Sequence, residues 1–122
     1  MATYVDGFVL SVSKKLLPAY RQMAKEGAVV WRKHGALEYK ECVLEDKKPK
    51  WITFTFPKMA KTKPSEVVIF SYIVYKSRKH RDQVNAKVMK EMDETMAKYK
   101  DKPMPFDMKR MAYGGFEVIV EA

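Results

Sequence analysis

The run EVVIFSYIVY at Glu66–Tyr75 decides the fold that this chain of 122 residues is expected to adopt. Apolar side chains occupy both sets of alternating positions, whereas a strand with one face in water alternates apolar and polar residues. The run therefore predicts a strand that is covered on both faces, at the centre of a sheet. It is also far shorter than the roughly 20 apolar residues that span a bilayer, so no membrane segment is expected.

A helix is expected on the N-terminal side of this strand, between Ser13 and about His34. Its apolar residues recur at three- and four-residue spacing, which places them on one face. Ser13 is the expected N-cap, and Gly35 is the expected C-terminal stop. Because Pro18 fits only the first turn of a helix, the regular helix is expected to begin a little after Ser13.

A second helix is expected directly after the central strand, with Ser77 as its N-cap. Val84, Val88 and Met92 form its buried stripe, while lysine and glutamate fill the opposite face. The prolines that begin at Pro103 are expected to end this helix.

Three further strands are predicted, at Tyr4–Val12, Ala36–Asp46 and Lys109–Glu121. The first and the last each contain glycine directly before phenylalanine, and glycine within a strand often marks the close approach of another backbone. These two strands are therefore expected to lie together, whereas Ala36–Asp46 alternates like an edge strand. Lys47–Pro64 is an irregular connection in which Trp51–Phe56 alternates like a short strand.

The resulting order, β-α-β-β-α-β, predicts one α+β domain over residues 1–122. It is the split βαβ, or ferredoxin-like, arrangement. In this arrangement two helices cover one face of a four-stranded antiparallel sheet, and the first and third strands are central. The two strands predicted to be central are also the two that carry apolar residues on both faces.

Two helices on one face leave apolar side chains on the other. Phe8 and Leu10 are expected there, with one of two sets from the central strand: Phe70, Tyr72 and Val74, or Val67, Ile69 and Ile73. Burying one such side chain is worth about 1.5 to 3 kcal/mol, so a second copy of the chain is the simplest cover. We therefore expect a homodimer, a dimeric α/β barrel. The competing explanation is a monomer whose second face is covered by Lys47–Pro64.

Several segments along the chain also resemble one family, and the proline-containing motif near the C-terminus is the most specific of them. These segments are Tyr4–Phe8, Gly35–Leu37, Glu41–Cys42, Glu66–Val68, Met104–Asp107, Lys109–Met111 and Tyr113–Glu117. Together they are similar to the YbaA-like family of small bacterial proteins of unknown function. The resemblance implies a ferredoxin-like subunit in a dimeric α/β barrel, and it implies no activity, substrate or catalytic residue. Lys47–Lys63 departs from the family pattern by being more basic.

The formal net charge of +9 comes mostly from lysines that are spread over the chain. Dispersed lysine favours solubility, because arginine is the residue suited to two-bond recognition of phosphate. Lys47–Lys63 nevertheless interleaves lysines with aromatic residues, as proteins that bind single-stranded nucleic acid do. Nucleic-acid binding through this segment is kept as an alternative function. The favoured interpretation is a solvated connection whose aromatic residues pack on the core.

Cysteine use and the first residues indicate the compartment. Cys42 is the only cysteine and is expected to be a small buried hydrophobic residue in a reducing environment. Met1–Thr3 leads directly into the first strand without the basic and apolar regions of a secretory signal. The cytoplasm is the expected location.

The candidate ligand site lies between the sheet and the helices, and its predicted residues are Asp6, Glu41, Ser71, Tyr72 and Arg110. Asp6 falls within a central strand, where an unpaired carboxylate is costly, so Arg110 or Lys109 is its expected partner. The leading hypothesis is a homodimer that binds a small molecule at this site, without cofactor or metal.

A dimeric-barrel monooxygenase or isomerase, either cofactor-independent or haem-dependent, is the alternative enzyme function. In its haem-dependent form, His80 is the candidate haem ligand. Tyr113–Phe116 leads into a strand rather than a helix, so no phosphate-binding loop and no nucleotide site are predicted.

Overall fold

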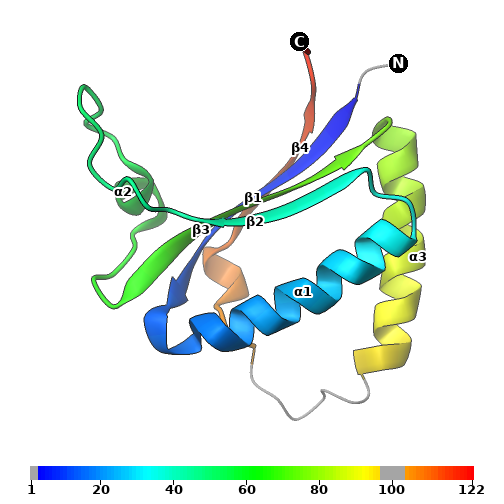
Figure 1. Cartoon of the computed structure of the whole chain (residues 1–122), viewed down its shortest axis with the longest axis horizontal. Helices are drawn as coiled ribbons and strands as arrows, with labels where there is room; N and C mark the ends of the chain where they lie inside the picture. Colours follow the sequence, from blue (N-terminus) through cyan, green and yellow to red (C-terminus); the bar gives the residue numbers. More distant parts are fainter. Residues whose placement is uncertain (1–2, 97–103) are drawn as a thin grey trace.

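The computed structural model describes residues 3–96 and 104–122, and Figure 1 shows their arrangement. The strands are β1 (Tyr4–Ser13), β2 (Glu38–Val43), β3 (Glu66–Tyr75) and β4 (Ala112–Glu117). The helices are α1 (Leu17–Lys33), α2 (Phe56–Ala60) and α3 (Arg78–Met96), with short 3-10 turns at Lys14–Leu16 and Met108–Arg110. The predicted helix end at Pro103 lies outside the described residues.

The four strands form one antiparallel sheet in the order β2-β3-β1-β4, so β1 and β3 are central as predicted. The bounds of β3 match the predicted Glu66–Tyr75. The helices α1 and α3 lie on the same side of this sheet (Figure 1). The sequence therefore correctly predicted an α+β fold with a four-stranded antiparallel sheet.

The caps of the two long helices agree with the sequence only in part. The expectation that Ser13 caps the first helix is wrong, because Ser13 precedes the 3-10 turn and its side chain makes no cap hydrogen bond. The regular part of α1 begins at Leu17, after a 3-10 turn, because Pro18 occupies its first turn. At the start of α3, Ser77 Oγ accepts a hydrogen bond from His80 N at 3.1 Å. This bond satisfies one of the backbone N–H groups that a helix start leaves open.

The prediction of a strand at Trp51–Phe56 is wrong. Thr55 caps the short helix α2 instead, because its hydroxyl accepts from Lys58 N at 3.5 Å and Pro57 fits the first turn. The last strand also begins later than the predicted Lys109. The Asp107 side chain accepts from Lys109 N at 2.9 Å and holds a 3-10 turn there.

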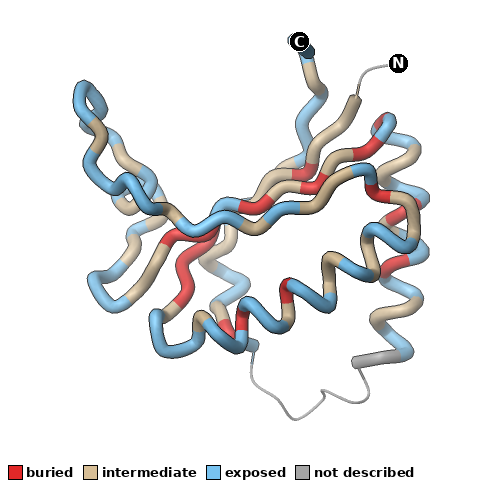
Figure 2. Tube along the Cα trace, in the orientation of Figure 1, coloured by how far each residue is buried: buried red, intermediate tan, exposed pale blue. Residues whose placement is uncertain are grey.

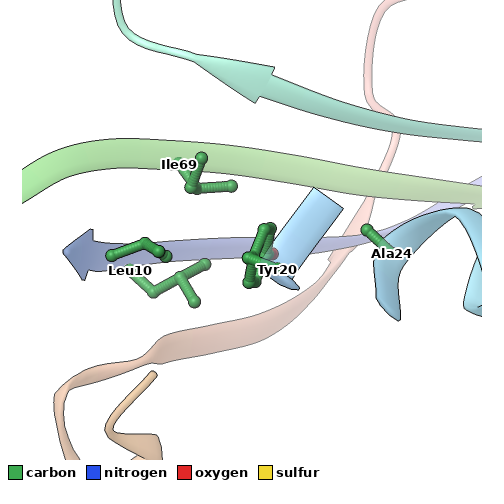
Figure 3. Close-up of a cluster of buried hydrophobic side chains, with 5 residues drawn as sticks. Leu10, Tyr20, Ala24 and Ile69 are labelled. Carbon is green, nitrogen blue, oxygen red and sulfur yellow. The ribbon is translucent and has the colours of Figure 1, made fainter. Parts of the chain in front are cut away.

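The helix face of the sheet, which α1 and α3 cover, carries two clusters of buried side chains. One contains Leu10, Val12 and Ile69 from the strands with Tyr20 and Ala24 from α1, and Figure 3 shows it. The other contains Ala36, Ile73, Tyr75, Val84 and Val88. Phe8 packs against both clusters and joins them into one core.

The expectation that Phe8 and Leu10 point away from the helices is wrong. Leu10 lies opposite Ile69 in the antiparallel ladder, and both pack on α1. Directly opposite residues share a face, so the register fixes the whole alternating set of β1.

The second face of the sheet, the open face, is largely apolar on β1, β3 and β4, whereas β2 contributes Glu38, Lys40 and Cys42 to it. It contains Val5 and Val9 of β1, Phe70, Tyr72 and Val74 of β3, and Phe116 of β4, as the strand pairing requires. Phe70 is 42% exposed and Phe116 is 60% exposed. The hydroxyl of Thr62, just after α2, is hydrogen-bonded to the hydroxyl of Ser11, with 2.8 Å between the two oxygens. This bond places the segment near one end of β1.

Residues 45–55 form an arm between β2 and α2, and it extends away from the sheet (Figure 1). Most of the arm is exposed (Figure 2), including Trp51 at 97% and Phe54 at 69%. The expectation that the aromatic residues of this connection pack on the core is therefore wrong for these two side chains.

Within the described residues, none of the helices combines the length and the apolar character needed to cross a membrane.

Candidate ligand site between α1 and β2

A groove of about 450 Å³ lies between α1 and the edge strand β2. Its lining is mostly apolar, with three polar or charged groups from α1 and two from β2. The residues are Leu17, Tyr20, Arg21, Ala24, Lys25, Ala28, Tyr39, Glu41, Val43 and Ile69. A volume of this size falls in the range of small-molecule sites, about 300 to 1,000 Å³.

The sequence leaves this space open through small residues. Ala24 and Ala28 lie one turn apart on the α1 surface that faces β2, where larger side chains would fill the groove. On β2 the alternation places Tyr39, Glu41 and Val43 on the helix face, opposite Ile73, Ser71 and Ile69 of β3.

The carboxylate of Glu41 is held by two phenols. Tyr20 donates to Oε1 at 2.7 Å, and Tyr39 donates to Oε2 at 2.8 Å. Burial, with the nearby Glu41 carboxylate, raises the pKa of Tyr20 and the pKa of Tyr39. Both phenols therefore keep their protons at neutral pH and remain hydrogen-bond donors to Glu41.

Asp6 lies elsewhere on the helix face and is 1% exposed. Its partner is Arg81 of α3, whose Nη1 donates to Oδ1 at 2.7 Å, and the Tyr113 hydroxyl donates to the same oxygen at 3.1 Å. The prediction that Arg110 or Lys109 pairs with Asp6 is wrong. Arg81 reaches Asp6 because the first turn of α3 packs across β1, with the guanidinium 5.0 Å from the centre of the Tyr4 ring.

Arg110 pairs with Glu66 instead. Its Nη1 and Nη2 donate to the two carboxylate oxygens at 2.7 and 2.9 Å, and Nη2 also donates to Lys61 O at 3.0 Å. The Arg110 hydrogen bond lowers the pKa of Glu66 to about 2. The 3-10 turn at Met108–Arg110 places this side chain at the start of β3, away from Asp6.

The predicted site residues are thus divided among separate places. Glu41 and Ser71 are direct neighbours across β2 and β3 on the helix face. Tyr72 lies on the open face, where its hydroxyl donates to Glu38 at 3.3 Å. Asp6 and Arg110 belong to two different ion pairs.

Of the groove residues, sequence reasoning predicted only Glu41 as a site residue, and the polar or charged ones that it missed are Tyr20, Arg21, Lys25 and Tyr39. Tyr20 lies at the three- and four-residue spacing of the apolar face of the first predicted helix, and a phenol on such a face needs a polar partner when it is buried. The need of the Tyr20 hydroxyl for a polar partner was the signal that could have linked it to Glu41. The positions of Arg21 and Lys25 at the groove had no signal in the sequence pattern.

His80, the candidate haem ligand, has both ring nitrogens close to neighbouring groups. Nδ1 accepts from Lys76 N at 2.9 Å, and a Cβ placed on Gly35 would lie 3.3 Å from Nε2. Burial lowers the pKa of His80, and the Lys76 and Lys87 charges add to the effect. Haem ligation by His80 stays a prediction.

Cys42 is exposed, so the expectation of a buried thiol is wrong. It lies on the outward-facing side of an edge strand, where alternation places every second residue away from the helices. In the described part of the chain, no group of three or more histidine, cysteine, aspartate or glutamate side chains could hold a metal ion.

Comparison with known proteins gives a family match over most of the chain. Residues 3–108 match the family described as "Protein of unknown function (DUF1428)". The chain is 42% identical over 118 residues to "Uncharacterized protein YbaA" of Escherichia coli (strain K12), covering 97% of each protein. The match to the protein of the same name from Shigella flexneri has the same identity and coverage.

Among solved structures, the chain is similar to "De novo designed protein Foldit4". The TM-score is 0.44 at 9% identity, over 98% of this chain and 99% of the designed one.

Proposed function

The chain belongs to the DUF1428 family of proteins of unknown function. We propose that it is a cytoplasmic homodimer that binds a small ligand. The ligand site is the groove between α1 and β2. The observation that carries this proposal is the carboxylate of Glu41, which lies in an otherwise mostly apolar groove with a phenol donor on each oxygen. A few fixed polar groups in an apolar hollow are typical of small-molecule sites.

The proposed subunit fold is ferredoxin-like. The strand order β2-β3-β1-β4, with α1 and α3 on one side, supports this assignment. The short helix α2 is then an addition within the connection between β2 and β3.

The proposed dimer packs the open faces of two sheets together as a dimeric α/β barrel. Phe70 and Phe116 lie on different strands of this face, and both are substantially exposed. Full burial of such a side chain is worth about 1.5 to 3 kcal/mol, and covering the exposed part of each ring contributes the corresponding fraction. A two-fold axis through the open face would cover Phe70 and Phe116 of both subunits at once. Two-fold symmetry is also the commonest symmetry of homo-oligomers.

Light scattering during size-exclusion chromatography tests the dimer. We expect a mass twice the 14.2 kDa of one chain, and Phe70→Lys with Phe116→Lys should reduce it to one chain. Leu16→Lys is the matched control, because Leu16 is 45% exposed but precedes α1 and does not lie on a strand. A wild-type mass of one chain contradicts the dimer.

Ligand binding is tested by native mass spectrometry of the purified protein, followed by NMR titration with whatever co-purifies. We expect the shifted resonances to come from residues 17–28 of α1 and from β2. Glu41→Gln should change the affinity, whereas Glu38→Gln, which replaces a carboxylate on the opposite face of the same strand, should not. Shifts confined to other elements contradict this site.

Single-stranded nucleic acid is a second candidate ligand, and the exposed arm favours it. Trp51 and Phe54 present their rings to solvent among Lys47, Lys48 and Lys50. Bases stack on exposed rings, and lysines neutralise phosphates, which makes binding depend steeply on salt. If the arm binds RNA, neutralising the three lysines should flatten the salt dependence measured by fluorescence anisotropy. Absence of binding at low salt excludes this function.

A further inference from the structure

We propose that the groove between α1 and β2 accepts an anionic amphiphile, a molecule with an apolar body and one carboxylate or phosphate group. The negative group lies against Arg21 and Lys25, and the body lies along the apolar lining. This inference rests on the proposed function, because it specifies the ligand class of the same groove.

The positive end of the site is formed by two cations of α1, Arg21 and Lys25. Arg21 and Lys25 line the groove, and within residues 3–96 and 104–122 neither side chain has a hydrogen bond or an ion pair. They stand four residues apart on α1, where like charges face each other and destabilise a helix by about 0.2–0.5 kcal/mol. A bound anion between them replaces this repulsion with attraction.

A second hollow of about 380 Å³ continues the positive charge beyond the groove. Arg21 and Lys25 line both spaces, and Lys14 adds a third cation to the second. Leu17, the first residue of α1, also lines both hollows, so the two lie next to each other along this helix. A ligand head of one or two charges would thus have up to three cations within reach at the same end of the groove.

The body of the ligand contacts the apolar lining. Leu17, Ala24, Ala28 and Ile69 provide it, and Val43 extends it at the edge of the sheet, where this side chain is 48% exposed. An apolar chain laid here would cover Val43 and contribute about 25 cal/mol for each Å² of apolar surface removed from water.

Glu41 makes the site selective for a single negative charge. Each of its oxygens accepts one phenol proton, and the carboxylate lies within the groove. A second anionic group on the ligand would either lie on the apolar lining or approach this carboxylate, and like charges repel strongly in a partly desolvated site. A hydroxyl or amide on the body of the ligand would instead donate to Glu41.

Isothermal titration with four probes of matched chain length tests the inference: decanoate, decyl phosphate, decan-1-ol and decanedioate, each below its aggregation concentration. We expect decanoate or decyl phosphate to bind at least about tenfold more tightly than decan-1-ol and decanedioate. The stronger of the two anions identifies the head group as carboxylate or phosphate. The double variant Arg21→Gln with Lys25→Gln should lose this preference.

Lys79→Gln with Lys90→Gln, two exposed lysines of α3, is the control that makes the same change in net charge. Equal binding of decanoate and decan-1-ol overturns the inference and leaves the groove as a ligand site. If decanoate binds equally well to the wild type, to Glu41→Gln and to the double variant of Arg21 and Lys25, the ligand lies elsewhere. That result overturns both the inference and the proposed function. Failure of all four probes to bind also overturns the inference, while the search for a co-purified ligand tests the proposed function separately.

Discussion

The hydroxyl of Tyr20 donates a hydrogen bond to Oε1 of Glu41 at 2.7 Å, which ties a buried residue of α1 to the edge strand β2. Replacing Tyr20 with phenylalanine keeps the ring in the core but removes one of the two donors to the carboxylate. We expect a loss of about 1 to 3 kcal/mol in the free energy of unfolding, measured by urea denaturation.

Tyr72→Phe is the matched control for this change. Its hydroxyl donates to Glu38 at 3.3 Å, and Glu38 is also paired with Lys40 at 2.8 Å, on the open face. The expected loss in the free energy of unfolding is therefore much smaller than for Tyr20→Phe. Equal losses of unfolding free energy in Tyr20→Phe and Tyr72→Phe would contradict a larger contribution of the Tyr20–Glu41 hydrogen bond to stability.

Removing Arg81 should destabilise the protein far more than removing an exposed charge. Arg81→Met leaves the buried carboxylate of Asp6 without its cation, at an expected cost of about 3 to 5 kcal/mol. The control is Arg78→Met, at an exposed position of the same helix turn. In a double-mutant cycle, adding Asp6→Asn to Arg81→Met should recover part of the loss, and failure to recover any would contradict a dependence on the ion pair.

The two adjacent glycines of β4 should respond differently to alanine. A Cβ on Gly115 would meet Cε2 and Cζ of Tyr4 at 2.8 and 2.9 Å, whereas a Cβ on Gly114 would meet Phe116 at ordinary distances of 3.5 and 3.6 Å. Gly115→Ala is expected to lower the melting temperature, through overpacking worth about 1 to 3 kcal/mol. Gly114→Ala should lower it less, and the opposite order would contradict the β1–β4 register.

The ion pair of Glu66 and Arg110 predicts a specific acid dependence of stability. Arg110 lowers the pKa of Glu66 from 4.5 to about 2, so the pair stabilises the folded state above pH 4.5. This contribution is lost as the pH falls from 4.5 to 2. The difference in unfolding free energy between the wild type and Glu66→Gln should therefore shrink across that interval, as measured by urea denaturation at each pH. A difference that stays constant across the interval contradicts the assignment. Arg110→Lys keeps the charge without the two-bond contact, so above pH 4.5 its unfolding free energy should lie between those of the wild type and Glu66→Gln.

The central strand and both long helices could be predicted because their signals are local. Glu66–Tyr75 carries apolar residues on both faces, and Ser77 caps the next helix, so neighbouring residues alone defined these elements. The alternation of Trp51–Phe56 was misleading for the same reason. It resembles a strand locally, but Thr55 and Pro57 favour a helix start, and no neighbouring strand pairs with this segment in the four-stranded sheet.

The candidate site could be predicted only in part, because its contacts are long-range. Glu41 and Ser71 were placed on one site, and they are neighbours across two strands. The partner of Asp6 is Arg81, 75 positions away in sequence, and the packing of α3 across β1 places it there rather than the predicted Lys109 or Arg110. The faces of β1 depend on register, which no local pattern of this strand fixes.

The position of β1 between β3 and β4 has a consequence for how the chain is made. Asp6 bonds Tyr113, which is 107 positions later in the sequence. At synthesis rates of about 5–20 residues per second, one edge of β1 waits about 5 to 20 s for its last neighbour. During that time an apolar strand edge is open to pairing with other chains, so the growing polypeptide is expected to depend on chaperones more than the finished protein does.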